Sequence, residues 1–160
     1  YVAGGYSSAA KEITGCVNTG AVSSSSHNAG GIVGYIYGQV TVDSCYNRGS
    51  CTSSSYRAGG ITAYLQSSSA AVKNCYTTGE TKVAYGSDSH AVIGNKSSGT
   101  VENCYYLSGL TADTSAAAKT ADELKALAPT LGDAFLAAPA DLNDGYPILR
   151  PLAQSCHISI

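Results

Sequence analysis

The sequence is poor in the residues that usually fill a globular core. Trp and Met are absent and Phe occurs once among 160 residues, although 44% of the chain is hydrophobic. Gly (18) and Tyr (12) are abundant instead. This hydrophobic content argues against disorder. Small apolar residues combined with glycine and tyrosine favour thin, repetitive β-structure with small residues inside and tyrosine on the surface.

Charge and long apolar runs are also scarce. Charged residues make up 12% of the chain and the formal net charge is −2, with no basic block. We therefore expect the chain to bind neither nucleic acid nor anionic lipid. No apolar run approaches the ~20 residues that span a bilayer, so no membrane span is expected.

The residues that usually carry chemistry form no recognisable constellation. The acidic residues of the first hundred positions are scattered, unlike the clustered carboxylates of solenoids that cleave polysaccharides. No nucleophile elbow, phosphate loop or zinc-binding helix is present, and the spacing of His and Cys fits no zinc module. We predict no catalytic residue, no metal site and no cofactor.

Two motifs recur at a fixed period. Cys16, Cys45, Cys75 and Cys104 are separated by 29, 30 and 29 residues. Each lies in a similar block, at 13–20, 42–49, 72–79 and 101–108. A glycine-rich block precedes the later cysteines, at 30–35, 59–64 and, less regular, 90–95. A fixed period of this length is typical of repeat architectures.

One such unit cannot bury its own apolar face, so the units are expected to stack. We predict an all-β fold: a parallel β-solenoid of about four coils of about 30 residues, with neighbouring coils about 4.8 Å apart. Each cysteine and the residue three before it are both apolar, yet an odd separation places them on opposite faces of a straight strand. The chain must therefore turn just before each cysteine, at residue types that tolerate or favour turns. These corner positions are Gly15, Ser44, Asn74 and Asn103.

The position two before each cysteine alternates in charge. Asp43, Lys73 and Glu102 follow Thr14 there. Stacking would place unlike charges in neighbouring coils, where like charges would repel. We expect a solvated edge.

Composition divides the chain into two parts. Residues 1–107 are predicted to form the repeats and residues 108–160 a C-terminal cap, in which leucine becomes common. A short helix is expected near 121–127, with Thr120 and Glu123 as a capping box and Pro129 as its stop. The cap would cover the last coil and protect its edge. Residues 1–4 look like the remnant of a glycine-rich block, so the chain is expected to begin inside a longer array.

The cysteines allow two arrangements. Stacked coils would bring Cys16, Cys45, Cys75 and Cys104 into one column, with Cα separations inside the disulfide range. Parallel rungs, however, point their Cβ atoms alongside one another, which favours buried free thiols acting as small hydrophobes. Cys51 and Cys156 lie outside this column and are the candidate pair for a disulfide.

Tyrosines follow three of these cysteines. Alternation turns Tyr46, Tyr76 and Tyr105 outward as an aromatic row, and Tyr35, Tyr37 and Tyr64 would add a second. Packing between coils explains such a row by itself. Alternatively, the row is a platform for sugar rings or a partner protein.

The motifs resemble a known family. The segments 30–35 and 42–49 are similar to the GLUG-motif arrays of bacterial cell-surface and adhesin-like proteins, which also occur in the stalks of immunoglobulin A peptidases. The segments 131–135 and 143–149 resemble the closing part of such arrays. The resemblance implies a secreted, extracellular, non-catalytic module, and the metal-binding helix motif of the peptidases is absent here.

Three functions follow from these observations. The first is a structural or adhesive module, a stalk or spacer of a bacterial surface protein. The second is a module that binds a surface glycan or host protein through the tyrosine row. The third is a subunit that stacks on copies of itself or on further repeats through an open N-terminal coil.

Overall fold

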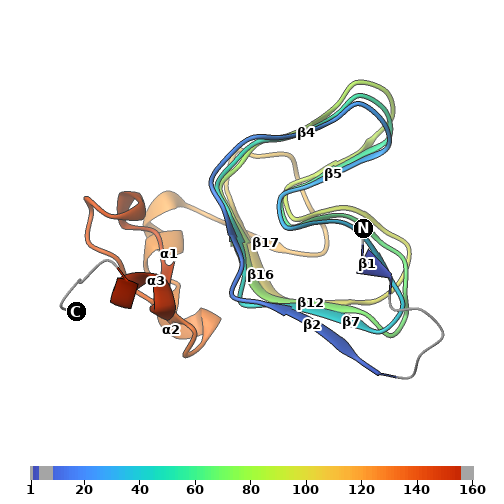
Figure 1. Ribbon diagram of the computed structural model, residues 1–160. Helices are drawn as coiled ribbons and strands as arrows, with labels where there is room; N and C mark the ends of the chain where they lie inside the picture. Colours follow the sequence, from blue (N-terminus) through green and yellow to red (C-terminus); the bar gives the residue numbers. More distant parts are fainter. Residues whose placement is uncertain (1, 4–8, 156–160) are drawn as a thin grey trace.

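The chain winds into a parallel β-solenoid (Figure 1). The computed structural model describes residues 2–3 and 9–155. Four parallel sheets line the coils, each built from one strand per coil. Two of them contain three strands each, which defines three complete coils with partial coils at either end. The predicted solenoid is confirmed, with slightly fewer full coils than the sequence indicated.

The strands are grouped by sheet as follows. The first sheet contains β1 (Val2–Ala3), β6 (Val33–Tyr37), β11 (Thr62–Leu65) and β15 (Ile93–Lys96). The second contains β2 (Lys11–Thr14), β7 (Val40–Asp43), β12 (Ala71–Thr77), β16 (Thr100–Leu107) and β17 (Ala117–Lys119), with β3 (Val17–Asn18) and β8 (Tyr46–Asn47) continuing its early strands. The third contains β4 (Val22–Ser24), β9 (Cys51–Ser53) and β13 (Thr81–Val83). The fourth contains β5 (Asn28–Gly30), β10 (Arg57–Gly59) and β14 (Asp88–His90).

The expected corner is present before each cysteine of the predicted column, here called the ladder cysteines (Cys16, Cys45, Cys75 and Cys104). The backbone φ angles there are +64° at Gly15, +52° at Ser44 and +51° at both Asn74 and Asn103. These are left-handed conformations, which glycine and asparagine adopt at lower cost than other residues. The turn lets the cysteine and the residue three before it both point inward, so this prediction is confirmed.

The third and fourth sheets form an arm that projects from the main coil (Figure 1). The chain runs outward along β4, returns along β5 and then reverses into β6. At this reversal a Cβ on Gly30 would lie 2.0 Å from the Val33 carbonyl oxygen. The glycine-rich block therefore exists because two backbones meet there. His90 takes the equivalent place in the last coil, in register with Gly59, and its Nδ1 lies 2.7 Å from the Gly94 carbonyl oxygen.

The chain's first strand aligns differently from the prediction. Val2 and Ala3 pair with Ile36 and Tyr37. The opening segment therefore matches the run after the glycine-rich block, and its assignment as a remnant of that block is wrong. The sequence match failed because Val-Ala-Gly is too short to set a register.

The C-terminal part begins as one more piece of sheet. β17 pairs in parallel with β16, so the solenoid continues to Lys119, beyond the expected boundary at residue 107. The predicted capping box then starts α1 (Ala121–Lys125): the Thr120 Oγ1 accepts from the Glu123 amide and the Glu123 carboxylate accepts from the Thr120 amide. Pro129 does not end this helix. It lies in the first turn of α2 (Ala128–Leu131), where its missing N–H costs nothing.

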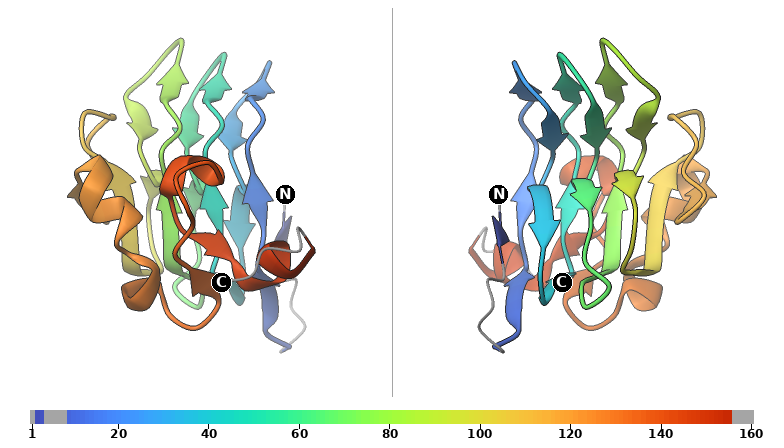
Figure 2. Two further views of the ribbon diagram at one scale, coloured as in Figure 1. Left: turned by 90° about the vertical axis from the view of Figure 1, so that its left-hand side faces the viewer. Right: turned by 90° about the vertical axis from the view of Figure 1, so that its right-hand side faces the viewer.

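The remaining C-terminal segment crosses the side of the solenoid. β18 (Phe135–Leu136) pairs antiparallel with β19 (Ile148–Leu149), and between them lies a 3-10 turn at Asn143–Gly145, followed by α3 (Arg150–Ser155). Figure 2 (left) shows this segment lying across several coils. It therefore covers a lateral face as well as the last coil, which corrects the expectation of a cap on the end alone. Within the described residues, no helix has the length and apolarity to cross a membrane.

Candidate functional site

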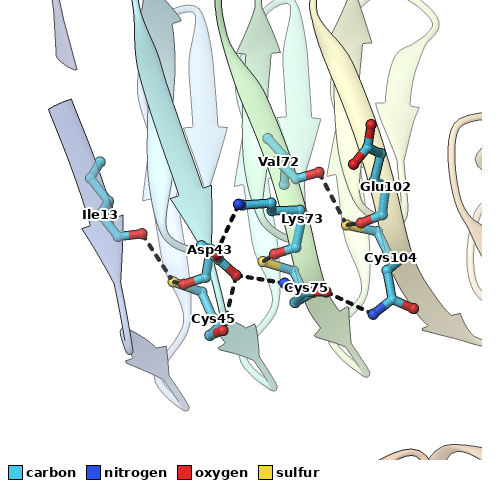
Figure 3. Close-up of polar contacts among 11 residues, drawn as sticks. Ile13, Asp43, Cys45, Val72, Lys73, Cys75, Glu102 and Cys104 are labelled. Carbon is cyan, nitrogen blue, oxygen red and sulfur yellow. Dashed lines mark hydrogen bonds and ion pairs between the residues drawn. The ribbon is translucent and has the colours of Figure 1, made fainter. Parts of the chain in front are cut away.

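The four ladder cysteines lie on successive rungs, and Figure 3 shows Cys45, Cys75 and Cys104. Cys75 is in register with Cys104, and the Cys16 amide donates to the Cys45 Sγ at 3.4 Å. The Cys45 thiol donates to the Ile13 carbonyl oxygen at 3.7 Å and the Cys104 thiol to that of Val72 at 3.6 Å. These two thiols lie closer, at 3.2 Å, to the carbonyl oxygen two residues earlier in their own coil, and the Cys75 thiol donates to the Lys73 carbonyl oxygen at 3.0 Å. The thiols therefore hydrogen-bond to backbone at the corner that precedes each of them.

The cysteines in the described part of the chain are all free thiols: Cys16, Cys45, Cys51, Cys75 and Cys104. The proposed partner of Cys51, Cys156, falls outside the described residues. Burial raises the pKa of Cys51 to about 11 and also raises that of Cys75. A hydrogen bond from Cys75 lowers the pKa of Cys45. A raised pKa keeps a thiol protonated and unreactive.

A second column beside the cysteines is polar and was not anticipated. Asn18, Asn47 and Thr77 each follow a ladder cysteine by two residues. The side-chain Nδ2 of Asn18 donates to the Asn47 Oδ1 at 2.7 Å. The Nδ2 of the fully buried Asn47 donates in turn to the Thr77 Oγ1 at 3.4 Å. Asn47 also closes a local turn with Gly49 through two hydrogen bonds. The signal was in the sequence, as Asn-x-Gly in two of the repeats.

The charged edge has the expected order. Lys73 lies in register with Asp43 on one side and Glu102 on the other. The Lys73 Nζ is 3.3 Å from the Asp43 carboxylate (Figure 3). Partial burial would raise the pKa of Asp43, but hydrogen bonds from Asn74 and Ser44 and the Lys73 charge lower it overall.

The tyrosine row points away from the coil interior, but it is not an open surface. Tyr46 and Tyr76 stack with ring centroids 5.0 Å apart and an interplanar angle of 8°. They are 3% and 0% exposed, because Phe135, Leu131 and Tyr146 of the C-terminal segment cover them. The prediction of an exposed ligand platform is therefore wrong for these two tyrosines.

Polar contacts hold the C-terminal segment on this row. The Tyr76 hydroxyl donates to the Pro147 carbonyl oxygen at 2.6 Å and accepts from the Asn143 amide at 3.1 Å. Arg48 forms an ion pair with Asp144 at 2.5 Å. Burial raises the pKa of Tyr76, which keeps the hydroxyl protonated as a donor.

Tyr105, the third member of the row, is half-buried at the last coil. Its hydroxyl donates to the Asn103 Oδ1 at 2.7 Å, and its ring packs at the edge of the same cluster. The sequence showed the outward direction of the row, but not that residues about 70 positions later would cover it.

The second tyrosine row remains partly accessible. Tyr35 and Tyr64 stack at 5.2 Å, and the Arg57 guanidinium lies 4.0 Å from the Tyr64 ring centroid. Tyr37 is exposed nearby. At the tip of the arm, Tyr56 is 52% and Tyr85 75% exposed, and Tyr56 stacks on His27 at 5.0 Å. Tip tyrosines were not predicted because they lie outside the aligned blocks.

At the last coil, a side-chain carboxylate accepts backbone amides that would otherwise have no acceptor in a following coil. In earlier coils the amides of Ile61 and Thr62 donate to the Val92 carbonyl oxygen of the next coil, and an equivalent pair donates to Ile61. At the final rung, the amides of Val92 and Ile93 donate instead to the Asp113 Oδ2, at 2.9 and 2.7 Å. The buried Asp113 thus replaces the carbonyl of a missing coil. Sequence reasoning missed it because it stands in a loop without a motif.

Asp88 is held by two polar side chains of the fold. Asp88 lies 3.6 Å from the Arg57 Nε and accepts from the Asn95 amide at 2.9 Å. Among the described residues, no group of three or more His, Cys, Asp or Glu side chains could hold a metal ion.

The comparisons with known proteins support the fold alone. No protein-family model and no curated protein matches the chain. Its structure is similar to the crystal structure of a "putative immunoglobulin A1 protease" from Bacteroides ovatus, with a TM-score of 0.66 and 24% sequence identity. The match covers 87% of this chain and 48% of that one, so the chain spans about half the length of that protein. The resemblance to GLUG arrays stays a prediction.

Proposed function

We propose that this chain is a non-catalytic structural module, a stalk or spacer of a secreted bacterial surface protein. The observation that carries the proposal is how the polar side chains are used. Asn47, Asp43 and Asp113 all bond to backbone or side chains of the fold itself. Repetition of contacts between neighbouring coils is typical of a scaffold.

The similar structure from Bacteroides ovatus agrees with this role in one respect. The chain corresponds to about half of that protein, and stalks are parts of larger chains. The extracellular location and the further repeats as partners rest on the resemblance of the motifs.

Insertion of an extra coil tests the proposal. Residues 40–69 form one repeat, and a second copy inserted after Ser69 would give the chain one more rung. If the chain is a spacer, the variant with the extra coil is expected to fold and to be longer by about 4.8 Å along the coil axis. Small-angle scattering and a crystal structure measure the length. A collapsed or unfolded product, or cleavage of immunoglobulin A1 or a polysaccharide by the unmodified chain, would contradict a passive spacer.

A second function, adhesion through the arm tip, is favoured by one observation. Tyr85 and Tyr56 are among the most exposed large side chains described, and they lie in the connections β13–β14 and β9–β10 at the outer end of the third and fourth sheets. Exposed tyrosines near serine-rich loops suit contact with sugar rings or a protein. A glycan array compares the wild type with a Tyr56→Ser, Tyr85→Ser double variant, using Tyr37→Ser as the control. Binding lost only in the double variant supports adhesion; identical profiles oppose it.

A further inference from the structure

A cleft of about 710 Å³ opens at the C-terminal end of the stack. One wall is the edge of β15 and the first half of β16, and the other is the loop 113–115. The cleft lies where the next coil would lie. Its volume is within the usual range for ligand sites.

Among the strands of the described residues, none pairs with the strand edges that line this cleft. β15 is the last strand of its sheet, and β16 pairs with β17 only from Tyr105 to Leu107. The side chains show the same gap: Val42 and Val72 are fully buried by the coils on either side, whereas Val101 is only partly buried. Unpaired backbone on a sheet edge is a template for another strand.

Earlier coils show what this edge accepts. β11 lies on β6 and β15 lies on β11, in each case parallel and in register. The column at the second position of these strands contains Gly34, Ala63 and Gly94. A Cβ on Gly94 would lie 2.6 Å from the Ala63 carbonyl oxygen. A strand on this edge therefore needs a small residue there.

Charge specifies a second position. Asp43, Lys73 and Glu102 occupy successive rungs of one column. The residue of an additional segment that aligns with Glu102 would take the next position in this column. A basic side chain there continues the alternation of charge.

The loop after β16 limits the occupant to a single segment that follows β15 and the first half of β16. Thr111 accepts from the Ala91 amide and Asp113 from those of Val92 and Ile93, so this loop covers the coil interior. A whole coil of a second copy cannot stack there. A shorter segment can bind there if it begins past the point where the Asp113 carboxylate accepts the amides of Val92 and Ile93.

We propose that this cleft binds one segment of a partner polypeptide, which runs parallel to β15, turns at the corner 97–99 and continues parallel to the first half of β16, with Gly or Ala beside Gly94 and Lys or Arg beside Glu102. This recognition mode is β-strand addition, in which backbone pairing supplies affinity and side-chain positions supply specificity. The site goes beyond the spacer role, and its failure would leave that role intact.

A peptide from the chain itself is the probe. Residues 62–73 contain Ala63 and Lys73 at the two required positions, and they cover the corresponding edges of β6 and β7 one coil earlier. The labelled peptide is titrated with the full chain and followed by fluorescence anisotropy. We expect saturable binding, lost on substitution of Ala63→Phe in the peptide. Absence of binding at millimolar protein would overturn the proposal.

Two protein variants locate the binding. Thr114→Trp fills the mouth of the cleft from an exposed position and is expected to weaken binding at least about tenfold. Thr52→Trp, at an exposed position on β9 outside the cleft, is the matched control and should bind as the wild type does. Circular dichroism verifies that both variants are folded. Equal affinity in all three proteins would place the peptide elsewhere.

A charge exchange tests the register. Glu102→Lys is expected to weaken the Lys73 peptide about fivefold, and a peptide with Lys73→Glu should recover that loss. No recovery would contradict the proposed alignment. Sedimentation of the chain alone provides the last test: self-association abolished by Thr114→Trp would assign the cleft to a second copy instead of a partner.

Discussion

At the residue scale, several side chains replace something that a neighbouring coil supplies elsewhere. Asp113 accepts the two amides that a next-coil carbonyl would accept, and Ser115 in turn donates to its other oxygen. A buried amide without an acceptor loses its bond to water and gains nothing. One carboxylate therefore closes the last rung.

Asp113→Ala is expected to destabilise the fold by about 1–3 kcal/mol, because two buried amides lose their acceptor. Asp113→Asn keeps a side-chain oxygen at the same place and should retain most of the stability. Urea unfolding followed by circular dichroism measures both. Equal losses for Ala and Asn would show that the amides do not depend on this oxygen.

Cys51 links stability to alkaline pH. Burial raises its pKa from 9.0 to about 11, so the folded state holds the proton more tightly than the unfolded state. The contribution is complete below pH 9.0 and is lost as the pH rises to about 11.

Cys51→Val places in this rung the residue found at Val22 in the first coil. We expect the variant to lose less free energy of unfolding between pH 9.0 and about 11 than the wild type loses. Urea titrations at the two ends of this range provide the measurement. An identical pH dependence would mean that other groups, such as Cys75 or Tyr76, account for it.

At the element scale, short strands are held by contacts between coils. A Cβ on Gly49 would lie 1.8 Å from the Gly20 carbonyl oxygen, and one on Gly79 would lie 1.9 Å from that of Gly49. Glycine is needed at these positions because the backbones of neighbouring coils approach too closely to leave room for a Cβ. The C-terminal segment is held differently, by an aromatic row and a few polar bonds to one lateral face.

Tyr76→Phe separates the two kinds of contact. It removes the bonds to Pro147 and Asn143 but keeps the ring packing, so a loss of about 1 kcal/mol is expected. Hydrogen exchange should quicken in 143–149 and stay unchanged in β7 and β12. Tyr85→Phe, at an exposed position, is the control. Faster exchange throughout the solenoid would show that the segment also holds the coils together.

At the scale of the whole molecule, stability should grow with the number of coils. Each added coil gives the stack one more interface between neighbouring coils, whose stabilisation exceeds the folding cost of the coil itself, so repeat proteins gain stability with length.

The chain with residues 40–69 duplicated is therefore expected to unfold at a higher urea concentration and with a steeper dependence on urea, since more surface is buried. Deletion of residues 40–69 should have the opposite effect. Equilibrium unfolding of the three lengths gives the comparison, and a midpoint independent of length would argue against additive coils.

The sequence alone determined the solenoid, its period and its corners, because these arise from residues that recur at fixed spacing. Gly15 and Asn74 reveal a left-handed turn, and four cysteines reveal the column. Only the tertiary structure decided which outward side chains stay exposed. Tyr46 and Tyr76 turn away from the coils as alternation requires, yet Phe135 and Pro147 cover them. Asp113 likewise acquires its role from amides some 20 residues away. Local spacing defines a rung, whereas contacts between distant segments that do not repeat leave no period in the sequence.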